Sequence, residues 1–123
     1  MITLKTLPQA TAQEVFDQIT QHLLQQGKAA KSATGACRYR VETAEGVLKC
    51  AAGCLIADDE YNREWENTYW PALVADEFAP DSHERLIYRM QAIHDFRSPG
   101  EWIRSFHEIA AEFSLTFTPP HNY

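Results

Sequence analysis

The sequence has no long apolar run and few cysteines. It contains no stretch of about 18 consecutive apolar residues, the length a membrane-spanning helix needs. Its first residues, MITLKTLPQA, lack the apolar stretch and small-residue cleavage site of a secretory signal. The three cysteines are an odd number and cannot all pair within one molecule. We therefore expect a cytoplasmic protein with reduced thiols and no membrane partner.

Positive charge is also scarce. Eleven Lys and Arg stand against seventeen Asp and Glu, which gives a formal net charge of -6. A sequence-independent nucleic-acid binder neutralises phosphates with basic side chains, so direct nucleic-acid binding is not expected. The deficit is concentrated in residues 58–84, where nine carboxylates accompany a single basic residue, Arg63. Residues 1–57, by contrast, carry six basic and four acidic residues.

The chain length fits a single domain, residues 1–123, and the residue pattern predicts an α+β fold. Apolar residues recur at helical spacing in three segments, which predicts helices over about 12–26, 82–96 and 99–114. Alternating apolar and charged residues over about 37–50 predict a central β-hairpin. The three helices and some short helical turns are expected to pack around that hairpin.

Local signals place several element boundaries. Thr11 with Glu14, and Ser98 with Glu101, have the spacing of a capping box, which begins a helix. Asp81 or Ser82 is the expected cap of the 82–96 helix, and Gly27 is the expected end of the first. Short strands are predicted at residues 2–5 and 115–118, and a short buried helix is predicted at residues 51–57.

One block of the sequence resembles a known family. It comprises CRYR at 37–40, Gly46, LKCAAGCLI at 48–56 and Asp59-Glu60-Tyr61, followed by Ile93-His94-Asp95 and Trp102. This order resembles a family of small phage and prophage proteins of unknown function. The resemblance implies a compact domain that acts in the cytoplasm of a host cell, and it implies no particular reaction.

The cysteines could serve chemistry or packing. Cys50, near the start of a short helix, could be a nucleophile with His94 as base and Asp95 or Glu60 as orienting carboxylate. Neighbouring helix positions point about 100° apart, so Asp95 is not expected to orient His94. Zinc sites usually use closer cysteine pairs than Cys50 and Cys54. We therefore favour buried packing thiols, with no catalytic residue, metal or cofactor.

Basic residues of the predicted hairpin suggest a second functional hypothesis. Arg38, Arg40 and Lys49 could bind a phosphorylated small molecule through bidentate arginine contacts. No glycine-rich phosphate loop accompanies them. Pairing of these side chains with the acidic residues 58–66 of the same chain is the simpler expectation.

The acidic segment is also aromatic, and this combination gives the preferred functional hypothesis. Tyr and Trp are enriched at binding hot spots, and surrounding carboxylates steer a basic partner. We expect a non-catalytic protein that binds and inhibits or modulates a host protein with a basic surface, such as a nucleic-acid-handling or defence factor. The predicted contact residues are Asp58, Asp59, Glu60, Tyr61, Trp65 and Glu66. The sequence leaves the oligomeric state open.

Overall fold

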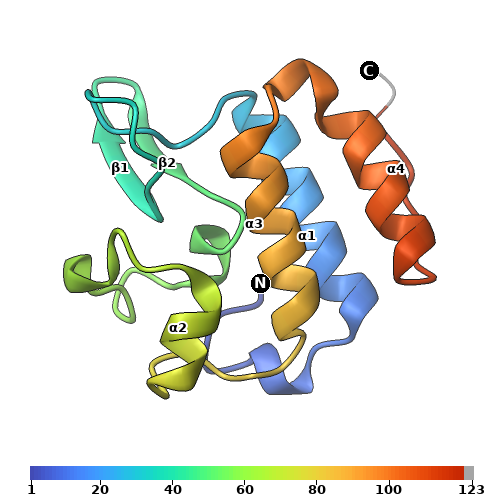
Figure 1. Cartoon of the computed structure of the whole chain (residues 1–123), viewed down its shortest axis with the longest axis horizontal. Helices are drawn as coiled ribbons and strands as arrows, with labels where there is room; N and C mark the ends of the chain where they lie inside the picture. The colour runs from blue at the N-terminus through green and yellow to red at the C-terminus, as the bar shows by residue number, and fades with distance from the viewer. Residues whose placement is uncertain (121–123) are drawn as a thin grey trace.

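The computed structural model describes residues 1–120 and confirms the α+β fold. Its helices are α1 (Ala12–Gln26), α2 (Trp70–Ala75), α3 (Glu84–Phe96) and α4 (Trp102–Glu112), and its strands are β1 (Arg40–Thr43) and β2 (Gly46–Lys49). Figure 1 shows α1, α3 and α4 as one helical layer, with the hairpin beside one end of it and α2 beside the other. Short 3-10 turns occur at Leu7–Gln9, Gly53–Leu55, Arg63–Trp65 and Pro99–Glu101.

Helix α1 begins and ends as its sequence predicts. The Thr11 side chain accepts from the Glu14 N–H, and the Glu14 carboxylate accepts from the Thr11 N–H, so the capping box is complete. Gly27 takes the left-handed conformation, with φ 73°, and its N–H bonds the Leu23 carbonyl. The second predicted capping box, Ser98 with Glu101, is also present.

The hairpin is present but shorter than the predicted 37–50, and it lies at the edge of the fold rather than at its centre (Figure 1), since none of its strand residues is buried. β1 and β2 are antiparallel, and Arg40 lies opposite Lys49 in their register. The short buried helix predicted at 51–57 is the 3-10 turn Gly53–Leu55. Residues 99–114, predicted as one helix, comprise the 3-10 turn Pro99–Glu101 and helix α4.

One predicted helix start and two predicted strands differ from the structure. Helix α3 starts after His83, whose φ is 58° and whose ring bonds the Ala10 carbonyl at 2.7 Å, rather than at a cap formed by Asp81 or Ser82. Residues 2–5 form a turn instead of a strand, because the Thr3 carbonyl accepts from the N–H of both Thr6 and Leu7. Residues 115–118 lie outside the sheet as well.

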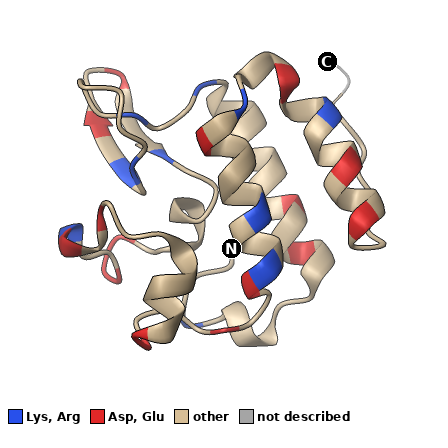
Figure 2. Ribbon diagram, in the orientation of Figure 1, with Lys and Arg blue, Asp and Glu red and all other residues tan. Residues whose placement is uncertain are grey.

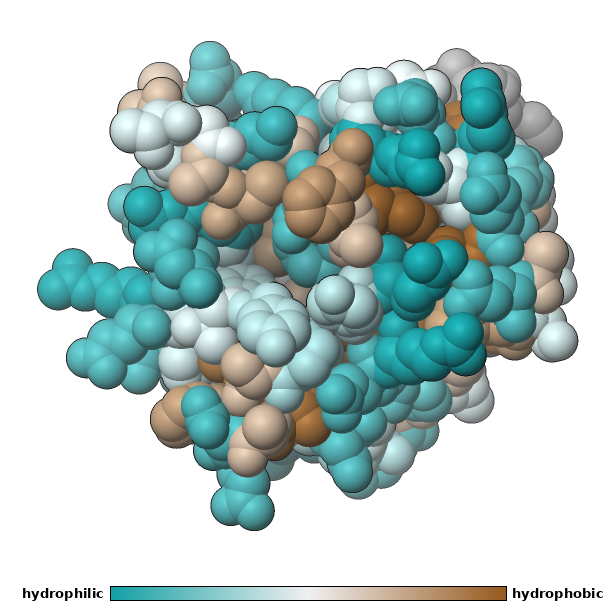
Figure 3. Space-filling view, in the orientation of Figure 1, coloured by the Kyte–Doolittle hydropathy of each residue, from teal (hydrophilic) through white to brown (hydrophobic). Residues whose placement is uncertain are grey.

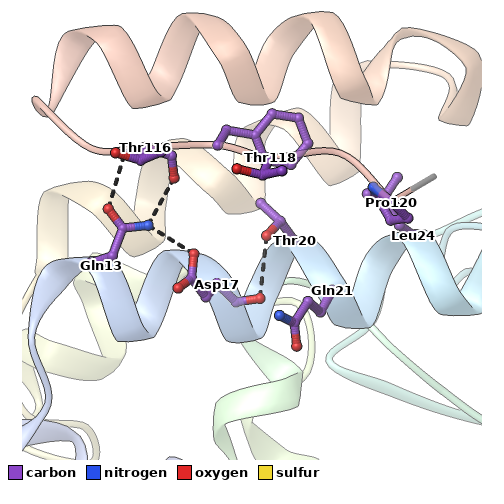
Figure 4. A pocket seen from close by; sticks show the side chains of 9 residues that line it. Gln13, Asp17, Thr20, Gln21, Leu24, Thr116, Thr118 and Pro120 are labelled. Atoms are coloured by element: carbon purple, nitrogen blue, oxygen red, sulfur yellow. Dashed lines mark hydrogen bonds between the residues drawn. The ribbon is translucent and has the colours of Figure 1, made fainter. Parts of the chain in front are cut away.

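Glutamine side chains of α1 hold the two irregular segments and the end of strand β2 in place. In each of three cases, one side-chain amide accepts from the backbone N–H of a residue and donates to the carbonyl of the same residue, as a neighbouring strand would. The pairs are Gln13 with Thr116, Gln18 with Ile2 and Gln26 with Lys49. Figure 4 shows the first pair, where the C-terminal segment runs along α1. These contacts satisfy backbone groups that no sheet partner reaches.

The core lies between the helical layer, α2 and the segment 50–56. Its largest fully buried side chains include Trp70, Trp102, Phe16 and Phe106. Residues 50–56 are all buried, and Gly53 permits a close approach there, since a Cβ at this position would lie 2.1 Å from the Tyr39 carbonyl oxygen. Within residues 1–120, no helix combines the length and the apolar character needed to cross a lipid bilayer.

Candidate functional site

The six predicted contact residues do not form one exposed group. Glu66 is only 9% exposed and points into the fold. Its carboxylate accepts from the backbone N–H of Tyr39 at 2.9 Å and of Arg40 at 3.2 Å, and from the Tyr61 hydroxyl at 2.6 Å. Burial and the bond to Glu66 raise the pKa of Tyr61 to about 12. Glu66 and Tyr61 therefore tie the acidic segment to the hairpin.

Glu60 and Asp58 are also engaged within the chain. Glu60 accepts from the N–H groups of Leu4, Lys5 and Ala57 at 2.9–3.0 Å, which anchors the N-terminal turn. Asp58 lies between the hairpin cations: it accepts a hydrogen bond from Arg40 and lies 3.5 Å from the Lys49 Nζ. The hydrogen bond from Arg40 is the main reason that the pKa of Asp58 is lowered.

The three basic side chains predicted to bind a phosphorylated ligand do not share one set of contacts. Arg40 and Lys49 share Asp58, and the Arg40 guanidinium also lies over the Tyr61 ring, 5.7 Å from its centroid. Arg38 belongs to neither contact and lines a separate pocket. Figure 2 shows basic residues on the hairpin and acidic residues on the neighbouring loop and at the end of α2. The three basic residues therefore do not converge on one phosphate-sized site.

The solvent-facing part of the segment 58–84, together with Tyr88 of helix α3, is aromatic as well as acidic. Tyr69, Phe78 and Tyr88 are 64%, 53% and 44% exposed. Phe78 packs on the half-buried Trp65 with ring centroids 5.8 Å apart, and Tyr69 packs on Tyr88 at 6.3 Å. We call this region the acidic–aromatic surface; it comprises these four aromatic residues and the exposed carboxylates Asp59, Glu64, Asp76 and Glu77.

The surface differs in membership from the predicted one. Of the six predicted residues, Asp59 and Trp65 remain in it, whereas Tyr69, Phe78 and Tyr88 join it. Figure 3 shows apolar side chains gathered over α2, bordered by hydrophilic groups of the loop 58–66. Tyr88 could have been found from the sequence, because it lies off the apolar face of α3 that Leu86, Ile87, Met90 and Ile93 define.

The groups considered for catalysis are held in structural contacts. The N–H of Ala30 donates to His94 Nε2 at 2.8 Å, so this nitrogen is an acceptor and the ring proton lies on Nδ1. Nδ1 is 2.8 Å from Asp95 Oδ1, and the expectation that Asp95 cannot orient His94 is therefore wrong. With Nε2 occupied, the imidazole has no free nitrogen to act as base.

The thiols have the properties of packing residues. All three cysteines are free, and Cys50 and Cys54 are buried. Burial raises the pKa of Cys50 well above its ordinary value, and that of Cys54 to about 12. Burial and the nearby Asp95 carboxylate raise the pKa of Cys37 to about 11. A nucleophilic cysteine needs the opposite shift, so the structure does not support the Cys50–His94 enzyme.

Cys37, His94 and Asp95 bring possible metal ligands within 4.8 Å of one another. A zinc-bound imidazole carries its remaining proton on the other nitrogen and donates it to an acceptor. If Nδ1 bound a metal, that proton would lie on Nε2, which faces the N–H of Ala30, a donor. The hydrogen bonds therefore fit a neutral, metal-free histidine.

Compared with models of protein families, with curated proteins and with solved structures, the chain gives no match in any of the three.

Proposed function

We propose that this chain is a non-catalytic accessory protein of phage or prophage origin. It acts in the host cytoplasm by binding a host protein with a basic surface and inhibiting or modulating it. The observation that carries the proposal is the acidic–aromatic surface, where exposed tyrosine and phenylalanine side chains lie among carboxylates that have no cation partner in residues 1–120.

The aromatic residues and the carboxylates of this surface have separate roles in binding. Exposed aromatic rings lose little conformational freedom when they are buried and contribute large contact areas, so they suit the centre of an interface. The carboxylates Asp59, Glu64, Asp76 and Glu77 speed encounter with a positively charged partner and fix its orientation. A basic partner is therefore selected by charge and held by apolar contact.

The non-catalytic part of the proposal is supported by the state of the histidine and the cysteines that were candidates for catalysis. His94 uses both ring nitrogens in hydrogen bonds, and the pKa values of the three thiols are raised. The proposed phage origin is based on the resemblance of most of residues 37–113 to phage and prophage proteins. Host proteins that handle nucleic acid carry basic surfaces, which makes a nucleic-acid-handling or defence factor the favoured target.

The test is capture from host lysate with matched variants. We expect immobilised wild-type protein to retain a basic protein at low salt and release it at high salt. The double variant Tyr69→Ser, Phe78→Ser should lose that protein. Phe96→Ser is the matched control, because Phe96 is 84% exposed and lies at the end of α3, outside the acidic–aromatic surface. Equal retention by the double variant and the wild type would overturn the proposal.

A further inference from the structure

An open groove lies at the edge of the acidic–aromatic surface, between the end of helix α2 and the N-terminal turn. Its volume is about 660 Å³. The apolar residues Leu4, Val74 and Ala79 line it, and they are buried or half-buried. Glu77 and Phe78, two members of the acidic–aromatic surface, also line it and are exposed. This Phe78 groove gives the proposed binding surface a concave part.

The turn that ends α2 holds two of the lining residues at the surface. Glu77 takes φ 63°, the left-handed conformation that ends many helices, and the N–H of Phe78 donates to the Leu73 carbonyl at 2.9 Å. The Phe78 ring packs on Trp65 with centroids 5.8 Å apart, yet it is 53% exposed. An aromatic ring is therefore held in place and open to a ligand, in the same groove as a carboxylate.

The groove carries more negative than positive charge. Glu77 and Asp81 both line it, both are exposed, and neither forms an ion pair within residues 1–120. Lys5 is the cation among the lining residues, and it also has no ion pair in that part of the chain. Because two carboxylates outnumber one ammonium group, the groove favours a cationic group from a partner.

The chain itself shows how an arginine fits such surroundings. In residues 1–120, two arginines lie over aromatic rings, with the guanidinium carbon 5.7 Å and 5.2 Å from the ring centroid. In both cases a carboxylate accepts a hydrogen bond from the same guanidinium. The two groups are Arg40 on Tyr61 with Asp58, and Arg85 on Phe113 with Glu112. The Phe78 groove has the ring and the carboxylates of such a group, and no arginine lines it.

We propose that the Phe78 groove receives an arginine side chain of the basic partner, with the guanidinium on the Phe78 ring and paired with Glu77. Asp81 adds negative charge, and Val74 contacts the aliphatic part of the arginine. Arginine is favoured over lysine because its planar guanidinium stacks on a ring while it bonds a carboxylate, whereas the ammonium group of lysine is compact and strongly hydrated. This inference rests on the proposed function and narrows the partner to a protein that presents arginine.

The first test titrates isotope-labelled protein with short blocked peptides and follows the backbone amide signals by NMR. The peptides alternate glycine with arginine, lysine or citrulline, the last being an uncharged analogue of arginine. The arginine peptide should shift the signals of Glu77, Phe78 and Ala79, and the lysine peptide should bind about threefold more weakly. The citrulline peptide should leave these signals in place. Equal affinity for the arginine and lysine peptides, or no shift with either, would overturn the inference.

The second test uses variants and the same peptides. Phe78→Leu keeps an apolar side chain but removes the ring, so it should weaken binding of the arginine peptide about threefold and abolish the preference over lysine. Phe96→Leu makes the same exchange at a residue that is 84% exposed and lies outside the groove, and it should bind like the wild type. Lys5→Gln should strengthen binding, because it removes a competing cation.

The inference and the proposed function fail in different experiments. An arginine preference that survives Phe78→Leu would place the guanidinium elsewhere and contradict the groove assignment. Equal capture of a host protein by the wild type and by the Tyr69→Ser, Phe78→Ser variant contradicts the protein partner itself.

Discussion

Glu66 Oε1 accepts a 2.9 Å hydrogen bond from the backbone N–H of Tyr39, which fixes a carboxylate of the acidic segment inside the fold. The other oxygen of Glu66 accepts from Arg40 and Tyr61. This buried anchor sets the path of the chain that follows, so that Tyr69 emerges at the surface. A single glutamate thus connects the hairpin to the acidic–aromatic surface.

Glu66→Gln should destabilise the protein by about 1–3 kcal/mol, because the amide nitrogen of glutamine would face at least one donor and leave it unsatisfied. Chemical denaturation monitored by tryptophan fluorescence measures this loss. Glu64→Gln is the control, since Glu64 is exposed and its side chain makes no hydrogen bond to the described residues. If the two variants unfold at the same denaturant concentration, the buried anchor has no energetic role.

Gly53→Ala should destabilise the fold by about 3 kcal/mol, at the upper end of overpacking effects. The new Cβ would lie 2.1 Å from the Tyr39 carbonyl oxygen and 3.3 Å from Cys50 Sγ, so backbone must move. Gly100→Ala meets no atom within 4 Å and should change the midpoint of thermal unfolding little. A Gly53→Ala protein with wild-type stability would show that the hairpin does not approach this turn so closely.

Gln26→Glu should cost about 1–2 kcal/mol, although it changes a single atom of the side chain. The amide nitrogen of Gln26 donates to the carbonyls of Lys49 and Lys28, and a carboxylate oxygen in its place would repel both. Gln25→Glu introduces the same charge at an exposed neighbouring position and should have a small effect. Denaturant unfolding of both variants decides whether the paired amide matters.

His22 should make stability depend on pH. Burial lowers the pKa of His22 below 6.5, so the unfolded chain binds its proton more readily than the folded protein. The stabilisation from the neutral ring is fully present above pH 6.5 and is lost as the pH falls below this value towards the folded-state pKa. His22→Gln should reduce this fall in unfolding free energy, and an unchanged pH profile would contradict the burial of the ring.

The helices and the hairpin could be predicted because their signals are local. Thr11 with Glu14 and the periodic apolar residues of α1 specify a helix whatever the rest of the chain does. The predicted strand at 115–118 failed because a strand needs a partner, and the backbone of Thr116 pairs with the Gln13 side chain instead. No local pattern distinguishes such a glutamine from a solvent-exposed one.

The candidate site was harder to predict for the same reason. Charge and aromatic content indicate residues 58–84 as a candidate surface, but the sequence does not distinguish Glu66 and Glu60 from the exposed Asp59. Whether each carboxylate is buried depends on which backbone amides the fold brings near it. Asp95 likewise reaches His94 through a side-chain conformation that helical spacing alone does not give. Tertiary contacts, rather than residue types, decide which carboxylates stay free.

The association rate of the captured partner tests the central claim most directly. The triple variant Asp59→Asn, Glu64→Gln, Asp76→Asn removes three exposed charges from the acidic–aromatic surface, and the triple variant Glu42→Gln, Glu45→Gln, Glu108→Gln removes three from elsewhere. We predict that the first slows association at low salt by about tenfold and flattens its dependence on ionic strength, whereas the second stays close to wild type. Equal rates and equal salt dependence for the two variants would contradict binding through this surface.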